Sequence, residues 1–184
     1  MADNRQKLTD VAQASVQKGG LRGLSFRTLA NEVGIKSSSV HYHFPEKSDL
    51  AQALIEQYTT TFMAKLEAIA AEPWSLKRKL TAFMAVIEDV ARTDSLCLCG
   101  MLAAELESLS AENRAALRRF FTAMASWLTR ELTAHADEVH SDLAPADLAS
   151  VMVSGIEGAL LIDRVQGDTV SLTAQQRLYT SLLR

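Results

Sequence analysis

Short polar and aromatic side chains are concentrated in one stretch of the chain, GIKSSSVHYHF at residues 34–44. Serine hydroxyls can hydrogen-bond to base edges or to phosphate oxygens, and a tyrosine hydroxyl or an imidazole can donate to a phosphate. The N-terminus of a helix also attracts anions. Lys47, shortly after this stretch, adds a positive point charge. Together these residue types favour contact with a nucleic acid.

Two short predicted helices position these side chains. Ser25 can cap a helix whose apolar residues within 26–33 recur at helical spacing, and Gly34 then supplies a tight turn. A second short helix begins near Ser37 and is fastened by Val40, so its polar side chains face outward. This length and spacing are typical of a helix-turn-helix, whose second helix enters the major groove with its N-terminal side chains leading.

The rest of the chain repeats its apolar residues at intervals of three and four and contains no sustained alternation that would indicate a sheet. We therefore predict an all-α fold of about nine helices, arranged as two packed helical units that the fourth helix joins. The predicted helix signals are a stop at Gly19-Gly20, Pro45 in the first turn of a fourth helix to about Ala70, Ser75 capping a fifth, a break at 93–95, a sixth from 96 to about 108, Ser110 capping a seventh to about Ala136, Pro145 opening an eighth to about Val165, Gly167 ending it, and a capping box of Thr173 and Gln176 in a ninth.

The charge is unevenly divided along the 184 residues. The chain carries a net charge of -3, which argues against indiscriminate binding to nucleic acids. Residues 1–50 contain seven Lys and Arg against five Asp and Glu, whereas the remainder contains 12 against 17. A slightly basic head on an acidic body suits a protein whose first 50 residues meet a polyanion. No uninterrupted apolar run approaches the roughly 20 residues of a membrane helix, so we expect a cytoplasmic protein with no membrane partner.

The motifs SFRTLA at 25–30, VGI at 33–35 and VHYHFPEKSDL at 40–50 resemble the DNA-binding domain of the TetR (tetracycline-repressor) family. This resemblance is strong over residues 5 to about 55. It implies a homodimer that binds a palindromic operator in double-stranded DNA, with Thr28, Tyr42 and Lys47 at phosphates and with Ser38 and Ser39 nearest the bases. The predicted DNA-binding residues are Arg27, Thr28, Lys36, Ser37, Ser38, Ser39, His41, Tyr42 and Lys47.

One position departs from the family pattern. His41 stands where the family usually has a tyrosine directly after the aliphatic residue of the recognition helix. An imidazole still donates a hydrogen bond, but it is shorter than a phenol, which puts a direct phosphate contact at this position in question. His43 and Phe44, in contrast, are expected to wedge the fourth helix against the first.

The resemblance further implies a transcription regulator, a repressor that a small-molecule inducer of unknown identity releases from its operator. We expect a DNA-binding domain at 1–46 and a ligand-binding and dimerisation domain at 47–184. Flexible and bulky apolar residues of the second domain are the candidates for an inducer cavity, although such residues at helical spacing also build ordinary cores. The predicted ligand-binding residues are Phe83, Met84, Ile87, Met101, Glu105, Phe120, Phe121, Met124, Trp127, Met152 and Ile156.

Glu105 is the one carboxylate in that set. If it turns inward, it can select a cationic or hydrogen-bonding ligand. The alternative is a solvated carboxylate paired with an Arg or Lys side chain.

Cys97 and Cys99 raise an alternative function. They lie at the start of the predicted sixth helix, where the positive end of the helix dipole can lower a thiol pKa. A thiol-based sensor of oxidants or electrophiles is therefore one alternative, and buried inert cysteines are the competing interpretation.

Small residues on the predicted eighth helix indicate close helix packing, because glycine inside a helix is unfavourable by about 1 kcal/mol unless a contact offsets it. A symmetry-related copy is the expected partner, in a four-helix dimer bundle formed with the ninth helix; packing within the chain is the alternative. The predicted dimer residues are Val151, Ser154, Gly155, Gly158, Ala159, Ile162, Leu178 and Leu182.

No catalytic spacing of serine, histidine and aspartate and no glycine-rich phosphate loop occurs after residue 70, and His135 and His140 flank a loop. We therefore expect no enzymatic activity, no cofactor and no metal site. A helical ligand-binding protein or enzyme with a non-functional head remains as a remote alternative.

Overall fold

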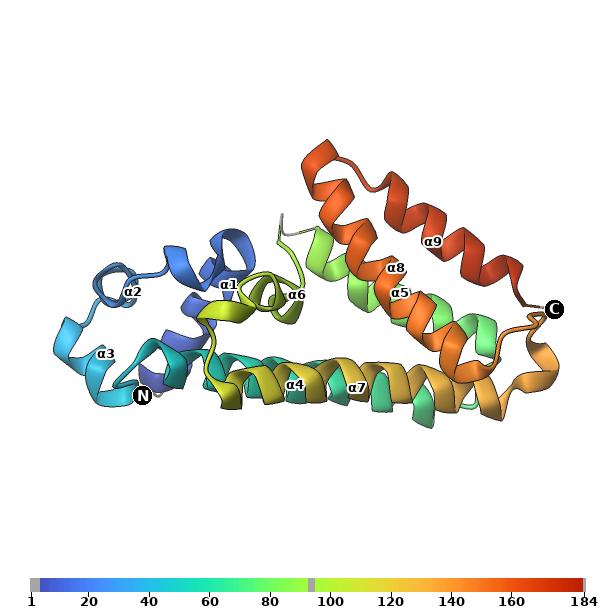
Figure 1. Cartoon of the computed structure of the whole chain (residues 1–184), viewed down its shortest axis with the longest axis horizontal. Coiled ribbons are helices and arrows are strands. Elements are labelled where there is room, and N and C mark those ends of the chain that lie inside the picture. The colour runs from blue at the N-terminus through green and yellow to red at the C-terminus, as the bar shows by residue number, and fades with distance from the viewer. Residues whose placement is uncertain (1–3, 93–94, 184) are drawn as a thin grey trace. The chain divides into compact units, whose positions relative to one another are not determined.

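The computed structural model describes residues 4–92 and 95–183, and these residues form nine α-helices and two short 3-10 helices (Figure 1). The predicted all-α class is therefore confirmed. The elements are α1 Asn4–Gly23, α2 Phe26–Val33, α3 Ser37–His43, α4 Lys47–Ala71, α5 Leu76–Ala91, α6 Leu98–Ala103, η1 Leu106–Ser108, α7 Ala111–Ala134, η2 Ala136–Glu138, α8 Pro145–Gln166 and α9 Val170–Ser181.

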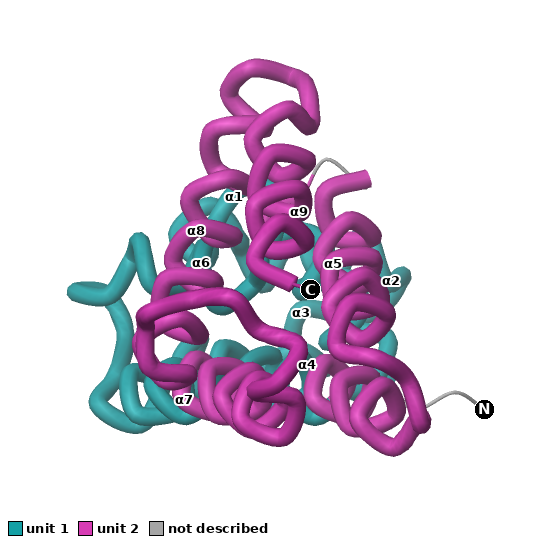
Figure 2. The backbone as a smooth tube through the Cα atoms, turned by 90° about the vertical axis from the view of Figure 1, so that its right-hand side faces the viewer, with its two compact units in different colours: residues 1–60, 97–120 teal, residues 61–96, 121–184 magenta. Residues whose placement is uncertain are grey.

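The chain divides into two compact units, drawn in different colours in Figure 2. The first contains residues 1–60 and 97–120, and the second contains residues 61–96 and 121–184. The first unit thus holds α1 to α3, the first part of α4, α6, η1 and the first part of α7. The predicted boundary at residue 46 assigns everything from α4 onward to the second domain. The division into a DNA-binding domain and a ligand-binding and dimerisation domain at residue 46 stays a prediction.

Each unit buries its own apolar residues. The first has among its fully buried side chains Leu8, Leu29, Val40, Phe44, Leu50 and Leu54. The second has Leu66, Leu76, Phe83, Met84, Trp127 and Ile156. Within the second unit the Trp127 indole donates to the carbonyl of Leu66 at 2.9 Å, so even this large polar-tipped residue has its hydrogen bond satisfied.

Local signals set several helix ends as predicted. Gly34 and Gly167 end α2 and α8 in the left-handed conformation, and the side chain of Ser110 accepts from the N–H of Asn113 in the first turn of α7. The predicted stop at Gly19-Gly20 appears as a break inside α1, where Gly20 has φ 77° and ψ 168°.

Other helix ends were predicted wrongly because distant residues supply the caps. Ser75 makes no side-chain cap, and Glu138 accepts from the N–H of Leu76 at 3.0 Å instead. The capping box at Thr173 and Gln176 is also wrong, since α9 begins earlier, at Val170.

The start of α9 is capped by Asp163, a residue of α8 that is only 4% exposed. Its carboxylate accepts from the N–H groups of Ser171 and Leu172 at 2.7 and 2.8 Å. Burial raises the pKa of Asp163, but the hydrogen bonds from Leu172 and Ser171 together outweigh burial and leave the pKa below its ordinary value.

The sixth and fourth helices also differ from the prediction. A single helix over 96–108 is replaced by the short α6 and the 3-10 turn η1, with Glu105 between them. Pro45 lies before α4 rather than in its first turn, because α4 begins at Lys47. Thr93 and Asp94, in the predicted break, lie outside the described residues.

Among the described helices, α8 is long and apolar enough by length and composition to cross a membrane, contrary to the expectation from sequence. In the most apolar window of α8, 33% of the residues are buried inside the structure. It packs on α9, where the Tyr179 hydroxyl donates to the Met152 carbonyl at 3.0 Å. One face of α8 thus packs within the chain, whereas Val151 and Ile162 on the same helix are each 50% exposed.

Candidate nucleic-acid interface

The turn between α2 and α3 is built by local hydrogen bonds. The Ser25 side chain accepts from the N–H of Thr28 at 3.0 Å and caps α2. At the other end, Gly34 adopts φ 75° and ψ 35°, and the N–H of Ile35 donates to the Ala30 carbonyl at 3.0 Å. This left-handed turn sends the chain into α3, which begins at Ser37. The predicted helix-turn-helix is thereby present within the first unit.

The helix α3 is held by one buried side chain and presents most of the others outward. Val40 is fully buried, whereas Ser37, Ser38 and His41 are exposed. Tyr42 is 83% exposed, which is unusual for so large a ring and leaves its hydroxyl available to a partner. Ser39 is half-buried. The residues around α3 that complete the predicted set, Arg27, Thr28, Lys36 and Lys47, are exposed.

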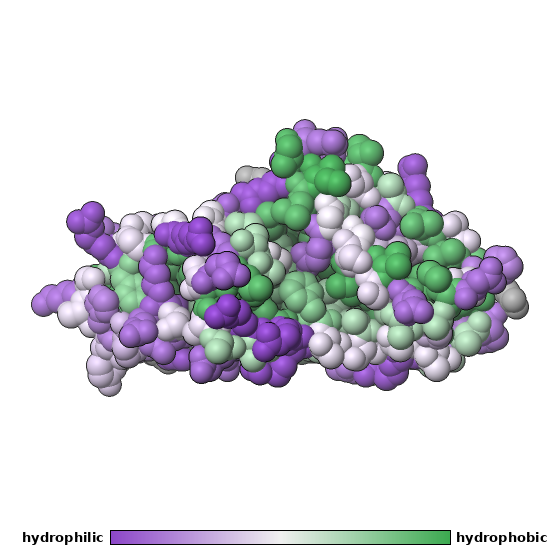
Figure 3. All heavy atoms as spheres, in the orientation of Figure 1, coloured by the Kyte–Doolittle hydropathy of each residue, from purple (hydrophilic) through white to green (hydrophobic). Residues whose placement is uncertain are grey.

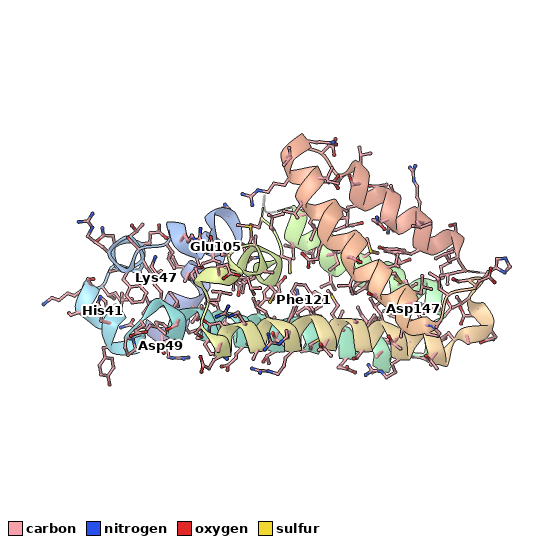
Figure 4. The ribbon with its side chains drawn as sticks, in the orientation of Figure 1. His41, Lys47, Asp49, Glu105, Phe121 and Asp147 are labelled. Carbon is pink, nitrogen blue, oxygen red and sulfur yellow. The ribbon has the colours of Figure 1, made fainter. Side chains whose placement is uncertain are left out.

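Three of these side chains already have partners in the protein. The Thr28 hydroxyl lies 2.7 Å from that of Ser25. His41, labelled in Figure 4, has its Nδ1 atom 3.4 Å from the Pro45 carbonyl, and its ring lies edge-on to Phe26 at 5.0 Å between centroids. The imidazole of His41 therefore packs against residues of its own chain. This agrees with the departure from the family pattern, in which a tyrosine usually stands at this position.

Lys47 is the third, and it faces the end of α1. Its ammonium donates to the carbonyls of Leu21 and Arg22 at 3.4 and 3.5 Å. The Glu105 carboxylate contacts the same turn and accepts from the N–H of Arg22 at 3.1 Å. The turn that follows the break in α1 is thus held through its carbonyls by a lysine and through its N–H by a glutamate, both labelled in Figure 4.

Glu105 therefore differs from both sequence interpretations. Its hydrogen-bond partner is a main-chain N–H of α1 rather than an Arg or Lys side chain, and it lies against Gly20 in the first unit. Met101 and Phe120 also belong to the first unit, and Phe120 packs beside Tyr58 with centroids 5.6 Å apart.

The other predicted ligand-binding residues lie in the second unit. They are Phe83, Met84, Ile87, Phe121, Met124, Trp127, Met152 and Ile156. All are buried except Phe121, which is half-buried, and the Phe83 and Trp127 rings stack at 5.6 Å between centroids. They form the unit's core, and their contact with an inducer stays a prediction.

The predicted dimer residues fall into two groups. Val151 and Ile162 are each 50% exposed and Leu178 is 48% exposed, although all three are large and apolar. On the face drawn in Figure 3, hydrophobic residues gather over α8 and α9. Ser154 is exposed, Gly158 has open space around it, and Leu182 is half-buried.

Gly155 and Ala159 form the second group and pack within the chain. A Cβ atom on Gly155 would lie 2.8 Å from the Gln175 side chain of α9, and Ala159 is 3% exposed. For these two residues the alternative of intrachain packing holds.

Cys97 and Cys99 are both buried, at 5% and 0% exposure. The Tyr58 hydroxyl lies 3.8 Å from the Cys97 sulfur. A reactive thiol needs access to its oxidant, so the structure gives the redox alternative no support. No group of three or more potential metal ligands occurs among residues 4–92 and 95–183.

An all-α chain with an exposed helix-turn-helix of this geometry is a DNA-binding transcription regulator. Comparison with known families gives two matches. Residues 8–54 match the model described as "Bacterial regulatory proteins, tetR family", and residues 77–177 match "Transcriptional regulator LmrA/YxaF-like, C-terminal domain". The chain belongs to the TetR family.

Individual relatives agree with this assignment. The chain is 29% identical to a TetR transcriptional regulator from Legionella pneumophila, with a TM-score of 0.93 over 100% of this chain and 99% of that one. A TetR-family regulator from Agrobacterium tumefaciens shares the fold, at 24% identity and a TM-score of 0.92 over 98% and 97% of the two chains. An HTH-type transcriptional regulator of Staphylococcus aureus is 30% identical over 67 residues, and this match spans 36% of both chains. The chain is thus matched over about a third of the length of such curated relatives.

Proposed function

We propose that this TetR-family regulator is a cytoplasmic homodimeric repressor that leaves a palindromic operator when a small molecule binds to it. The observation that carries the proposal is α3, a helix fastened by the buried Val40 that exposes serine hydroxyls and the Tyr42 ring. In the proposed complex, Ser38 and Ser39 reach base edges, and Thr28, Lys36, Tyr42 and Lys47 reach phosphates. We propose no enzymatic activity.

Symmetry sets the geometry of operator binding. Two recognition helices of a dimer reach successive major grooves only when they lie about 34 to 36 Å apart, one helical turn of DNA. An inducer that binds better to a conformation with another separation shifts the population away from DNA. The buried side chains of the second unit, Phe83, Trp127 and Met152 among them, are the proposed contacts for an apolar or aromatic inducer.

Measurement of DNA binding tests the proposed roles of the residues on and around α3. Lys36→Ala is expected to weaken binding to all duplexes and to lower the slope of log K against log salt by about 0.9, the loss of one phosphate contact. Ser38→Ala is expected to change the preference among operator sequences, because a base contact specifies and a phosphate contact does not. Ser126→Ala, an exposed serine on α7 in the second unit, is the control. Equal losses on operator and random duplex in both variants would remove the assigned roles.

The oligomeric state tests the dimer surface. Ile162→Glu places a charge in the exposed apolar stripe of α8 and should convert a dimer to a monomer in sedimentation velocity. Leu143→Glu is the matched control, because Leu143 is also 50% exposed and lies in the same unit but precedes α8. A wild-type monomer, or a dimer that both changes leave intact, would exclude this surface.

A screen for the inducer completes the test. A small molecule that raises the unfolding temperature and releases the protein from DNA flanking its own gene is the expected result. A compound that stabilises the protein and leaves the DNA complex intact would contradict release by an inducer.

A further inference from the structure

His41 lies on the face of α3 that the proposed function turns toward DNA, one helical turn after Ser37. Its side chain is exposed, as are those of Ser37, Ser38 and Tyr42, and it is labelled in Figure 4. The two nitrogens of its ring have different surroundings. This difference determines what the ring can offer to a phosphate.

One ring nitrogen of His41 faces its own chain. Nδ1 lies 3.4 Å from the Pro45 carbonyl oxygen, and the ring packs edge-on against Phe26 with the centroids 5.0 Å apart. A carbonyl oxygen can only accept a hydrogen bond, and the contact of one ring nitrogen sets which nitrogen of a neutral imidazole carries the proton. The contact with Pro45 therefore favours the neutral tautomer with its proton on Nδ1.

The other nitrogen, Nε2, has no hydrogen-bond partner among residues 4–92 and 95–183. In the tautomer with its proton on Nδ1, Nε2 has a lone pair and cannot donate. A phosphate oxygen is also an acceptor, so it gains no hydrogen bond from this form of the ring. A second proton turns Nε2 into a donor and gives the ring a positive charge, and both changes favour a phosphate. A bond from His41 to a phosphate thus requires the imidazolium form.

The charged groups around His41 nearly cancel one another. The segments that adjoin it, which are α2, the turn before α3 and the start of α4, contain three cations and three carboxylates: Arg27, Lys36 and Lys47, and Glu32, Glu46 and Asp49. The other titratable rings of α3 are Tyr42 and His43, and from α1 the Arg5 guanidinium lies over the Phe44 ring. In the described part of the chain none of these groups forms an ion pair with His41. A phosphate on the Nε2 side would therefore add a negative charge that favours the imidazolium.

We propose that His41 binds a DNA phosphate through Nε2 and takes up one proton from solvent when it does so. The proton bonds to the Nε2 lone pair, so the interface gains one positive charge. This inference rests on the proposed function, because the phosphate belongs to the operator. Since the DNA complex holds one proton more than the free protein, operator affinity should rise as pH falls through the range of about 8 to 5 in which imidazoles change their charge.

DNA binding of the full chain, measured with a duplex from the DNA that flanks the protein's own gene, tests the proton uptake. The wild type is expected to bind about fivefold or more tightly at about pH 6 than at about pH 8.5, because it gains one charge-assisted hydrogen bond. The slope of log K against log salt should also be steeper by about 0.9 at the lower pH, since one more phosphate charge is neutralised. His41→Gln cannot become charged and should show neither difference.

Matched variants separate His41 from the other histidines. His43→Gln, at a half-buried position of the same helix, and His140→Gln, at an exposed position of the second unit, should keep the pH dependence of the wild type. His41→Lys is charged at both pH values and should keep the steeper salt slope at both. If His41→Gln retains the pH dependence, or if His43→Gln removes it, the proposal is overturned.

NMR of the ring nitrogens tests the tautomer without DNA. In the free protein at about pH 8.5, where imidazoles are neutral, the nitrogen–proton correlations of His41 should show a protonated Nδ1 and a bare Nε2. The opposite tautomer would contradict the proposal, because a neutral ring with its proton on Nε2 can donate to a phosphate and needs no further proton. DNA binding with the same affinity and salt slope at both pH values would refute the proposal and leave the proposed function intact. Absence of DNA binding at both pH values would refute the two together.

Discussion

Gly20 is the position at which the structure predicts the largest effect of adding one methyl group. Its φ of 77° and ψ of 168° fall in a region that essentially only glycine occupies, and a side chain there is strained by about 1 to 3 kcal/mol. A Cβ atom would also overlap Oε1 of Glu105. The displaced carboxylate would lose its hydrogen bond to the N–H of Arg22, worth about 1.5 to 3 kcal/mol. Gly20→Ala should therefore destabilise the chain by about 4 kcal/mol.

Gly34→Ala is the matched control. Gly34 has nearly the same φ, 75°, but a ψ of 35°, and a Cβ atom there would meet nothing within 4 Å. Its expected cost is the left-handed conformation alone, about 1 to 2 kcal/mol. In urea unfolding followed by far-ultraviolet circular dichroism, the midpoint of Gly20→Ala should lie about 1 M below that of Gly34→Ala.

A double-mutant cycle isolates the contribution of Glu105. In a Glu105→Ala background the carboxylate is absent, so Gly20→Ala should add only the backbone strain and its cost should fall by about half. If Gly20→Ala and Gly34→Ala cost the same, or if the Glu105→Ala background leaves the cost of Gly20→Ala unchanged, the assigned contact between Glu105 and the break in α1 is refuted.

Three further changes follow from the described contacts. Asp163 has a lowered pKa, so its contribution is present above the ordinary carboxyl pKa of about 4 and is lost as pH falls through the lower folded value; Asp163→Asn should remove this acid dependence from the urea midpoint. Glu131→Leu leaves the buried ammonium of Lys79, 2.9 Å away in the wild type, without its counter-ion and should cost about 3 to 5 kcal/mol, whereas adding Lys79→Met should recover most of that stability in the same measurement. Ser25→Ala removes a side-chain cap and should cost about 1 kcal/mol, and Ser75→Ala, which removes none, should cost clearly less; equal costs would contradict the capping assignment.

The helices and the head were predictable because their signals are local. Serine caps, left-handed glycines and apolar residues at intervals of three and four act within a few residues of one another, so the sequence around Ser25 and Gly34 specifies the turn that presents α3. The motif that resembles the TetR family lies in the same short stretch. Sequence also separated the outward serines and Tyr42 from the inward Val40.

The wrongly predicted helix ends share a physical cause. The N–H groups at the start of a helix donate to any suitably placed oxygen. In this chain the oxygens that cap α5 and α9 belong to Glu138 and Asp163, which are 62 and 8 or 9 residues away along the chain. The capping signals nearest the predicted starts, Ser75 and Thr173, are local and do not include these oxygens. The side-chain nitrogen of Asn113 on α7 likewise donates to Ser48 and Gln52 on α4, which are 65 and 61 residues away along the chain.

Glu105 shows what such a distant contact adds to function. The sequence left it between an inward ligand-binding role and a solvated ion pair, and the structure joins it to the N–H of Arg22, 83 residues away. Lys47 holds the carbonyl of that same residue, so one main-chain turn is bound from both sides. If Lys47 turned toward a DNA phosphate, the Arg22 carbonyl would lose this donor, whereas the bond from the Arg22 N–H to Glu105 and the bond from the Leu24 N–H to the Leu21 carbonyl would remain. A change of partner at Lys47 should therefore alter the end of α1 first. The main-chain N–H resonance of Arg22 in an NMR spectrum is the most direct reporter of that change.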